Sequence, residues 1–208
     1  MHDSGTFGLF LAASLALALT PGPNWVYLVS RTVAQGRRAG LASCCGTTAG
    51  LVVHVLLAAS GLTALLALVP AAYQAIRLIG AAYLLWMAWD LMRAPPADAP
   101  RAAAQPLPVR VMLRQAWLTS VLNPKVAVFY AAFLPQFIDA AGSVLTQTLT
   151  LGAINVAMVA SADVVLILVA ARVATALGVG SRVLLGRRAL GAVFAGLAGW
   201  LAFDRRGA

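Results

Sequence analysis

Asn123, Pro124 and Lys125 stand in the middle of an apolar segment of membrane length, residues 113–138. A proline leaves carbonyl groups of the preceding turn without a backbone donor, and in lipid they must bond to protein, water or a ligand. A charged side chain at such a depth is costly and by default marks a pathway or a binding site. Lys125 could therefore neutralise the carboxylate of a bound molecule or pair with an internal aspartate. The alternative is a lysine whose ammonium group reaches the membrane interface along its alkyl stem.

A second break interrupts the first apolar segment, where the chain reads Thr20, Pro21, Gly22, Pro23, Asn24. The two prolines remove two backbone donors, and the glycine permits a tight bend. If a helix restarts after Pro23, its N-terminus offers free amides and a partial positive charge to an anion such as a carboxylate. A kink absorbed by neighbouring helices is the alternative. Broken helices in corresponding positions of two halves indicate a transporter's substrate site.

Two further polar residues lie deep within apolar segments. Asp163 could bind an ammonium group, pair with Lys125 or exchange a proton during transport, whereas a fixed ion pair that stabilises the bundle is the alternative. His54 could carry a proton because histidine titrates near neutral pH. A histidine that is simply hydrogen-bonded within the core is the alternative.

The composition predicts an all-α integral membrane protein that positions these residues on spans. The chain is 62% hydrophobic and 10% charged, with a mean hydropathy of +0.88, whereas soluble domains carry about a quarter charged residues. A membrane helix needs roughly 20 mostly apolar residues. Six spans are predicted, at residues 7–29, 41–66, 71–92, 113–138, 145–171 and 184–203.

The six spans divide into two halves of a single membrane domain, residues 1–208. Residues 1–93 and 109–208 each supply three spans, and residues 94–108, rich in alanine and proline, form the linker. An odd number of spans reverses the orientation, so the halves are predicted to be inverted repeats with broken first and fourth spans. Arginines fall in the first, third and fifth loops. The positive-inside bias therefore places these loops and the linker in the cytoplasm and both termini outside, although Arg205 and Arg206 argue against this.

Several classes of protein receive no support from the sequence. It contains no glycine-rich phosphate loop, zinc-ligand spacing or nucleophile elbow, so we expect neither an enzyme nor a cofactor or metal. The net charge of +9 arises from arginine clusters between apolar segments, which indicate topology rather than nucleic-acid binding. Cys44 and Cys45 are adjacent, which suits ordinary disulfide geometry poorly. Gly46 and Gly50 predict a close helix contact, and a homodimer through such glycine faces stays open.

Several sequence motifs of this chain resemble those of the lysine-exporter (LysE) type translocators, and more closely those of their homoserine and threonine (RhtB-type) efflux branch. The motifs are Thr20 to Asn24, Gly46 to His54, Gly80-Ala81-Ala82-Tyr83-Leu84, Asn123-Pro124-Lys125 and Phe133-Leu134-Pro135-Gln136-Phe137. The resemblance covers nearly the whole chain. It implies a six-helix exporter of amino acids or small derivatives in the bacterial inner membrane, driven by the proton-motive force. It also implies that Asp163 and His54 correspond to the family's aspartate and histidine in the fifth and second helices.

These observations together predict alternating access around a site at the middle of the membrane. Lys125 and the amides after Pro23 would bind the carboxylate of an amino acid, Asp163 its ammonium group, and Asn24 and Asn123 would orient it. Protonation of Asp163 or His54 would weaken the site in one orientation, which requires different affinities in the two states. Threonine, homoserine or another neutral or hydroxy amino acid is favoured. Thiol–disulfide or metal-ion carriers of the same superfamily are the alternative, but the former need cysteines on different helices.

Overall fold

The computed structural model describes residues 4–61, 107–139 and 141–176, together with Leu78, Ala82, Leu85, Trp86, Trp89 and Ala195. All regular structure in these residues is helical, which confirms the predicted all-α fold. The elements are α1 (Ser4–Leu19), α2 (Pro23–Gln35), α3 (Arg37–Ala59), α6 (Val109–Val121), α7 (Pro124–Val128), the π-helix η1 (Phe129–Phe133), the 3₁₀ helix η2 (Leu134–Phe137) and α8 (Val144–Ala176). Residues 94–106 of the linker and, apart from the isolated residues named above, the third and sixth predicted spans lie outside the described residues.

Both predicted breaks are bends between consecutive helices. The segments Gly5–Leu19 and Pro23–Gln35 meet at 48°, and Val109–Val121 and Pro124–Phe137 meet at 46°. Two helices, α3 and α8, are long and apolar enough to cross a membrane, and there are up to four such spans if each bent pair is counted as one. The described residues thus contain the first, second, fourth and fifth predicted spans.

The predicted end of the second span, at residue 66, is wrong. Helix α3 ends at Ala59 and is followed by a turn in which Gly61 has φ 73°. A glycine with positive φ is a common helix terminator because it has no Cβ to clash in the left-handed region. Apolar character continues past this turn in the sequence, so hydropathy alone placed the boundary too late.

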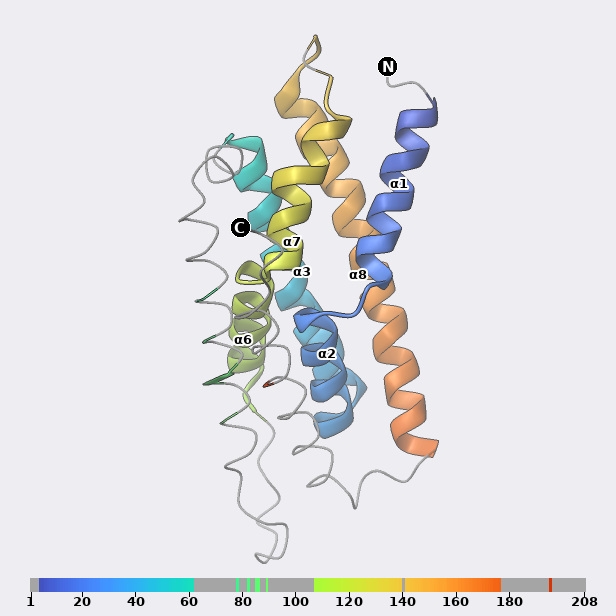
Figure 1. Ribbon diagram of the computed structural model, residues 1–208. Helices are drawn as coiled ribbons and strands as arrows, with labels where there is room; N and C mark the ends of the chain where they lie inside the picture. Colours follow the sequence, from blue (N-terminus) through green and yellow to red (C-terminus); the bar gives the residue numbers. More distant parts are fainter. Residues whose placement is uncertain are drawn as a thin grey trace, which may run out of the picture.

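The spans of the two halves run in opposite directions (Figure 1). The bent pair α1–α2 runs from the end of the molecule near the N-terminus to the other end, and α3 returns. In the second half, α6 and α7 run in the direction of α3, and α8 runs back. For the first two spans of each half, this is the inverted arrangement expected from an odd number of spans per repeat.

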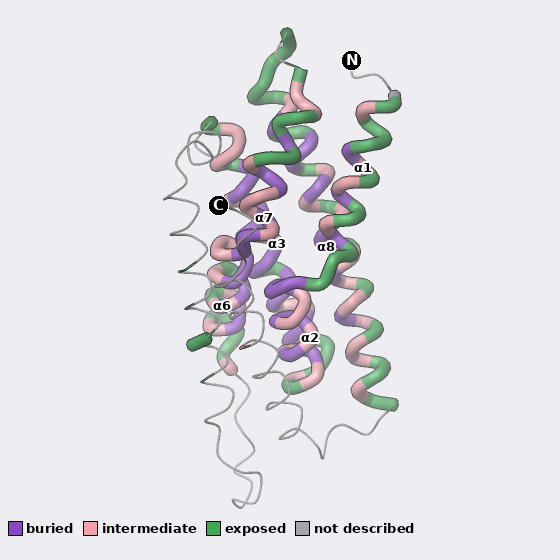
Figure 2. The backbone as a smooth tube through the Cα atoms, viewed as in Figure 1, coloured by how far each residue is buried: buried purple, intermediate pink, exposed green. Residues whose placement is uncertain are grey.

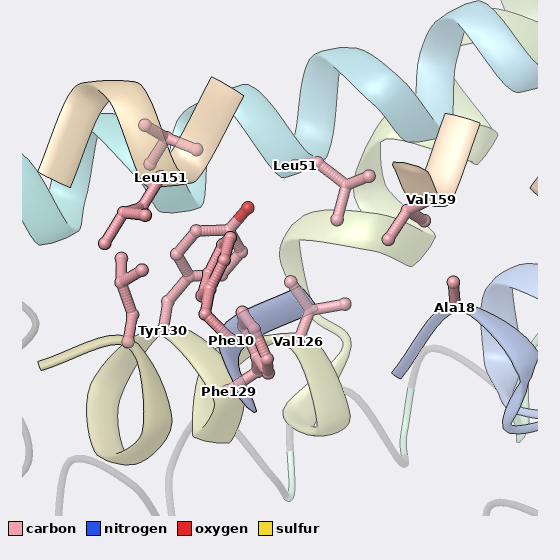
Figure 3. Packing of buried hydrophobic residues seen from close by; sticks show 10 residues of the cluster. Phe10, Ala18, Leu51, Val126, Phe129, Tyr130, Leu151 and Val159 are labelled. Atoms are coloured by element: carbon pink, nitrogen blue, oxygen red, sulfur yellow. The ribbon is translucent and has the colours of Figure 1, made fainter. Parts of the chain in front are cut away.

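Helix α3 lies at the centre of the bundle and packs most extensively against α6 and α8. Gly46 and Gly50 allow the approach to α6, because a Cβ at Gly46 would lie 2.6 Å from the Ala116 Cβ. The predicted close contact is therefore found within one chain. A buried cluster that includes Phe10, Leu51 and Tyr130 joins α1, α3 and η1 (Figure 3). Exposed positions follow the outer sides of α1 and α8 (Figure 2), as expected for helices whose outer faces contact lipid.

Candidate functional site

The two breaks contact each other through a pair of buried asparagines. Asn123 Nδ2 donates to Asn24 Oδ1 at 3.0 Å, and Asn24 Nδ2 donates to Ser120 Oγ at 3.3 Å. All three side chains are buried. Removing one partner from such a buried pair leaves a polar group unsatisfied, which costs about 1–3 kcal/mol. The hydrogen bonds therefore tie the first half of the chain to the second at the level of the breaks.

Each helix restarts after its break with a proline in the first turn. Asn123 is the N-cap of α7, and its Oδ1 accepts a hydrogen bond from Lys125 N at 3.1 Å. Pro124 follows at the first helical position, where a missing N–H is harmless. At the other break, Gly22 is the N-cap of α2 and makes no side-chain cap, and Pro23 opens the helix. The first backbone hydrogen bond of α2 runs from Val26 N to Gly22 O. The amides of Asn24 and Trp25 come before Val26 and are free of intrahelical bonds.

Lys125 bonds to the C-terminal end of α1. Its ammonium group donates to Leu17 O at 3.0 Å and to Thr20 O at 2.6 Å. In an uninterrupted helix Leu17 O would accept from residue 21, but Pro21 has no N–H. Lys125 thus supplies the donor that the proline lacks, at the negative end of the helix dipole. Its stem passes Gly22, where a Cβ would lie 3.4 Å from the Lys125 Cε.

Asp163 lies between α8 and α3 with 1% of its surface exposed. Neither carboxylate oxygen has a hydrogen-bond donor in the part of the chain that the structure describes. The nearby hydroxyl of Thr47 donates to Cys44 O instead, at 3.0 Å. A buried charge without a partner is strongly unfavourable. A proton, a cation or a donor from a bound molecule would stabilise Asp163 in this setting.

His54 belongs to a second cluster of polar side chains, which is joined to the asparagine pair through Ser120. Its Nε2 lies 3.2 Å from Ser120 O, so this nitrogen carries the proton that is donated. The ring stacks on Tyr130 with 5.9 Å between centroids, and Tyr130 OH donates to Asn155 Oδ1 at 2.8 Å. Asn155 is fully buried and its Nδ2 lacks a partner among the described residues. The structure thus places His54 on Ser120, beside the breaks, rather than next to Asp163.

Sequence reasoning missed Ser120, Tyr130 and Asn155. Serine and tyrosine are common in helices and gave no signal, but Asn155 was readable as a polar residue within an apolar span. It lies eight residues before Asp163, about two helical turns, so both side chains fall on one buried face of α8. The π-helix that contains Tyr130 could not be foreseen from composition.

A cluster at the α2–α6 contact lies between the asparagine pair and the end of the molecule formed by the α2–α3 turn. Tyr27 OH donates to Met112 O at 2.9 Å, and the Arg31 guanidinium donates to Gln115 Oε1 at 2.5 Å. The guanidinium carbon also lies 5.2 Å from the centre of the Tyr27 ring. We call Tyr27, Arg31, Met112 and Gln115 the α2–α6 clamp. It joins the two halves a second time.

Neither cysteine is paired in the structure. Cys44 is buried and Cys45 exposed, and both thiols are free. Within the described ranges, no three His, Cys, Asp or Glu side chains converge as metal ligands would.

Comparison with known proteins identifies a family to which the chain is similar. The family model described as LysE type translocator matches residues 15–205. A leucine efflux protein of Salmonella typhimurium is 30% identical over 131 residues, 62% of each chain, and one of Enterobacter sp. is 32% identical over 138 residues, 64% of each. An uncharacterized membrane protein of Vibrio cholerae is 34% identical over 143 residues, 69% of this chain and 70% of its own. The chain therefore spans less than two thirds of the leucine efflux proteins. No solved structure matches it.

Proposed function

The chain belongs to the LysE type translocator family, and from this premise we propose that it exports amino acids or small amino-acid derivatives from the bacterial cytoplasm. The family is one of translocators rather than enzymes. The observation that supports a transport site in this chain is the hydrogen bond between Asn24 and Asn123, since it joins two broken helices from opposite halves. Paired broken helices near the membrane midplane are a recurring form of substrate site in transporters.

The groups around this bond suit a zwitterion. The free amides after Pro23 and the Lys125 ammonium group are available to a carboxylate, and Asp163 provides the opposite charge for an ammonium group. Asn24 and Asn123 would orient the substrate. Pro21, Gly22 and Pro124 hold the backbone open between the helices.

A neutral amino acid is the proposed substrate. The resemblance to the homoserine and threonine efflux branch favours a hydroxy amino acid, whereas two of the relatives reported above are named leucine efflux proteins. These candidates share the same zwitterionic head group. Lys125 and Asp163 supply one charge for each end of such a molecule, so a further charge on the side chain would be left without a partner.

We propose that transport proceeds by alternating access with proton antiport. The α2–α6 clamp would close one side of the site and would have to open during the cycle. The end that carries the clamp and the arginines would face the cytoplasm of the inner membrane, with both termini outside. Asp163, together with His54, would carry the proton, and residues 1–93 and 109–208 would be the two moving repeats. A homodimer is compatible with this scheme and is not required by it.

Transport into proteoliposomes tests the proposal. With an acidic lumen, outward proton flow should drive accumulation of labelled leucine, threonine or homoserine, and lysine should accumulate less. Asp163→Asn should abolish accumulation, because the variant cannot exchange a proton at this position. Asp139→Asn is the matched control, since Asp139 is exposed in the loop before α8 and should be dispensable. Absence of any amino-acid uptake by the unaltered protein would contradict the function.

A further inference from the structure

Lys125 and Asp163 carry opposite charges near the centre of the molecule, yet among the described residues each lacks the partner that its charge favours. The ammonium group of Lys125 rests on two neutral backbone carbonyls. Both oxygens of Asp163 lack a donor among the described residues. Leu19 and Trp25, which flank the first break, line one cavity together with Ser161 and Ala162, the residues before Asp163, so the two charges lie at the same level of the bundle. Two opposite charges that lie near each other without pairing indicate a site in which one of the two can change place or protonation.

The carbonyls that hold Lys125 form a site for a primary ammonium ion. Leu17 O is available because Pro21 cannot donate to it, and Thr20 O is available because α1 has ended. Both carbonyls lie at the C-terminal end of α1, which is the negative end of the helix dipole. A lysine ammonium group and the α-ammonium group of an amino acid are the same chemical group, with three N–H donors on a tetrahedral nitrogen. We call Leu17 O and Thr20 O the α1 carbonyl site.

We propose that Lys125 is an internal competitor for the substrate's ammonium group at the α1 carbonyl site, and that the protonation state of Asp163 decides which of the two occupies it. With Asp163 protonated and neutral, Lys125 stays on the carbonyls and excludes the substrate. When Asp163 releases its proton, the carboxylate attracts Lys125 and frees the carbonyls. The substrate ammonium then binds backbone oxygens in place of Asp163, and the amides after Pro23 hold its carboxylate without Lys125, which replaces the assignment of the two charges given under the proposed function.

This arrangement, which rests on the proposed function, makes proton and substrate mutually exclusive. Antiport requires that the protein carry one or the other across the membrane but not both, which is a negative coupling between two sites. One proton leaves Asp163 as one neutral zwitterion binds, and the proton returns when the zwitterion leaves. The lysine stem passes Gly22, where an added Cβ would lie 3.4–3.7 Å from it, in ordinary van der Waals contact.

The other polar and titratable side chains that the structure describes around Lys125 and Asp163 are either uncharged or held by other partners. On α3, Asp163 faces Cys44 and Thr47, which carry no charge in their ordinary state. Arg31 of α2 is held in the α2–α6 clamp, and His54 is held by Ser120 O. The described residues of α1 include no titratable side chain. Within the part of the chain that the structure describes, Lys125 is therefore the cation on which a change at Asp163 acts.

A double variant distinguishes this switch from direct binding of the substrate by Asp163. The assay is counterflow, the exchange of labelled for unlabelled substrate across proteoliposomes without net proton movement. Asp163→Asn fixes the neutral state, so Lys125 should remain on the carbonyls and counterflow should fall by about tenfold or more. Adding Lys125→Met empties the α1 carbonyl site, and counterflow should return while proton-driven accumulation stays absent. Arg172→Met, which removes an exposed charge from α8, is the control and should change neither activity.

If the double variant is monodisperse and as inactive as Asp163→Asn, Asp163 holds the ammonium group directly and the switch is wrong. A second measurement uses the unaltered protein, so its result does not depend on whether the variants fold. Isoamylamine, a primary ammonium ion at neutral pH, should inhibit counterflow of leucine, and its N-trimethyl analogue should not, because carbonyls require N–H donors. Equal inhibition by both would overturn the proposal. Failure of the unaltered protein to transport any amino acid would overturn the function itself, which separates the two results.

Discussion

Asn123 combines a local and a long-range role in one side chain. Its Oδ1 caps α7 by accepting from Lys125 N, and its Nδ2 bonds to Asn24 across the two halves. An amide is the side chain that can accept at one end and donate at the other. The same residue therefore restarts the fourth span and fixes the position of the first.

Asn123→Ala should destabilise the protein more than truncation of an exposed amide. The variant loses a helix cap, worth about 1 kcal/mol, and leaves Asn24 Oδ1 buried without a donor, at about 1–3 kcal/mol. We expect a lower midpoint of thermal unfolding in detergent. Gln136→Ala is the control, because Gln136 is exposed and its amide donates to Ala132 O within its own turn. In a double-mutant cycle, additive effects of Asn24→Ala and Asn123→Ala would show that the bond between them contributes nothing.

The polar residues at the breaks were predictable, but the partners of Lys125 were not. Proline next to a charge in an apolar segment marks a break from sequence alone, and the symmetry of the halves suggested that the two breaks meet. The bond to Leu17 O and Thr20 O depends on how closely α1 approaches α7, which is a result of packing. Side-chain chemistry pointed to carboxylates, whereas the structure uses two backbone carbonyls, one left free by Pro21 and the other by the end of α1.

At the scale of elements, glycines set the distance between α3 and its neighbours. A Cβ at Gly50 would lie 2.5 Å from the Ser120 Cβ, and one at Gly152 would lie 2.5 Å from the Val55 Cγ1. The contact at Gly50 brings Ser120 close enough to bond both Asn24 and His54. The G-x-x-x-G spacing predicted such a face, but its partner, α6 rather than a second chain, required the structure.

Gly46→Ala should therefore separate α3 from α6. The added methyl group would meet the Leu113 carbonyl oxygen at 2.6 Å, a backbone atom that cannot rotate away. Overpacking of this kind typically costs about 1–3 kcal/mol, and we expect a lower unfolding midpoint and weaker transport. Gly8→Ala on α1 is the matched control, because nothing lies within 4 Å of a Cβ at Gly8. If the two variants unfold at the same temperature, the close contact of α3 with α6 is not a tight constraint.

At the scale of the whole molecule, inversion of the halves accounts for the meeting of the two breaks. In Figure 1, α1–α2 and α6–α7 run in opposite directions, so a break near the middle of each falls at the same depth. Inversion also brings α2 against α6 on one side of the breaks, where the α2–α6 clamp forms. Two half-helices from different repeats thus form one side of the site, while Lys125 and α1 form the other.

Charges of the described residues are distributed unequally between the two ends of the molecule. Arginines lie at or near the end formed by the start of α3, the start of α6 and the end of α8: Arg31, Arg37, Arg38, Arg110, Arg114 and Arg172. Asp139 lies in the loop before α8, at the opposite end. Positively charged residues are retained on the cytoplasmic side during insertion, so the arginine end should face the cytoplasm.

Labelling of single cysteines in intact cells checks this orientation. In a background carrying Cys44→Ala and Cys45→Ala, a membrane-impermeant maleimide should label Ala141→Cys from outside. Arg37→Cys and Arg110→Cys should react only after the membrane is opened, because both positions are exposed at the arginine end. Labelling of Arg37→Cys in intact cells, with Ala141→Cys protected, would reverse the orientation. The α2–α6 clamp would then close the outer side of the site, and substrate in the cytoplasm would meet the break from the side of Lys125.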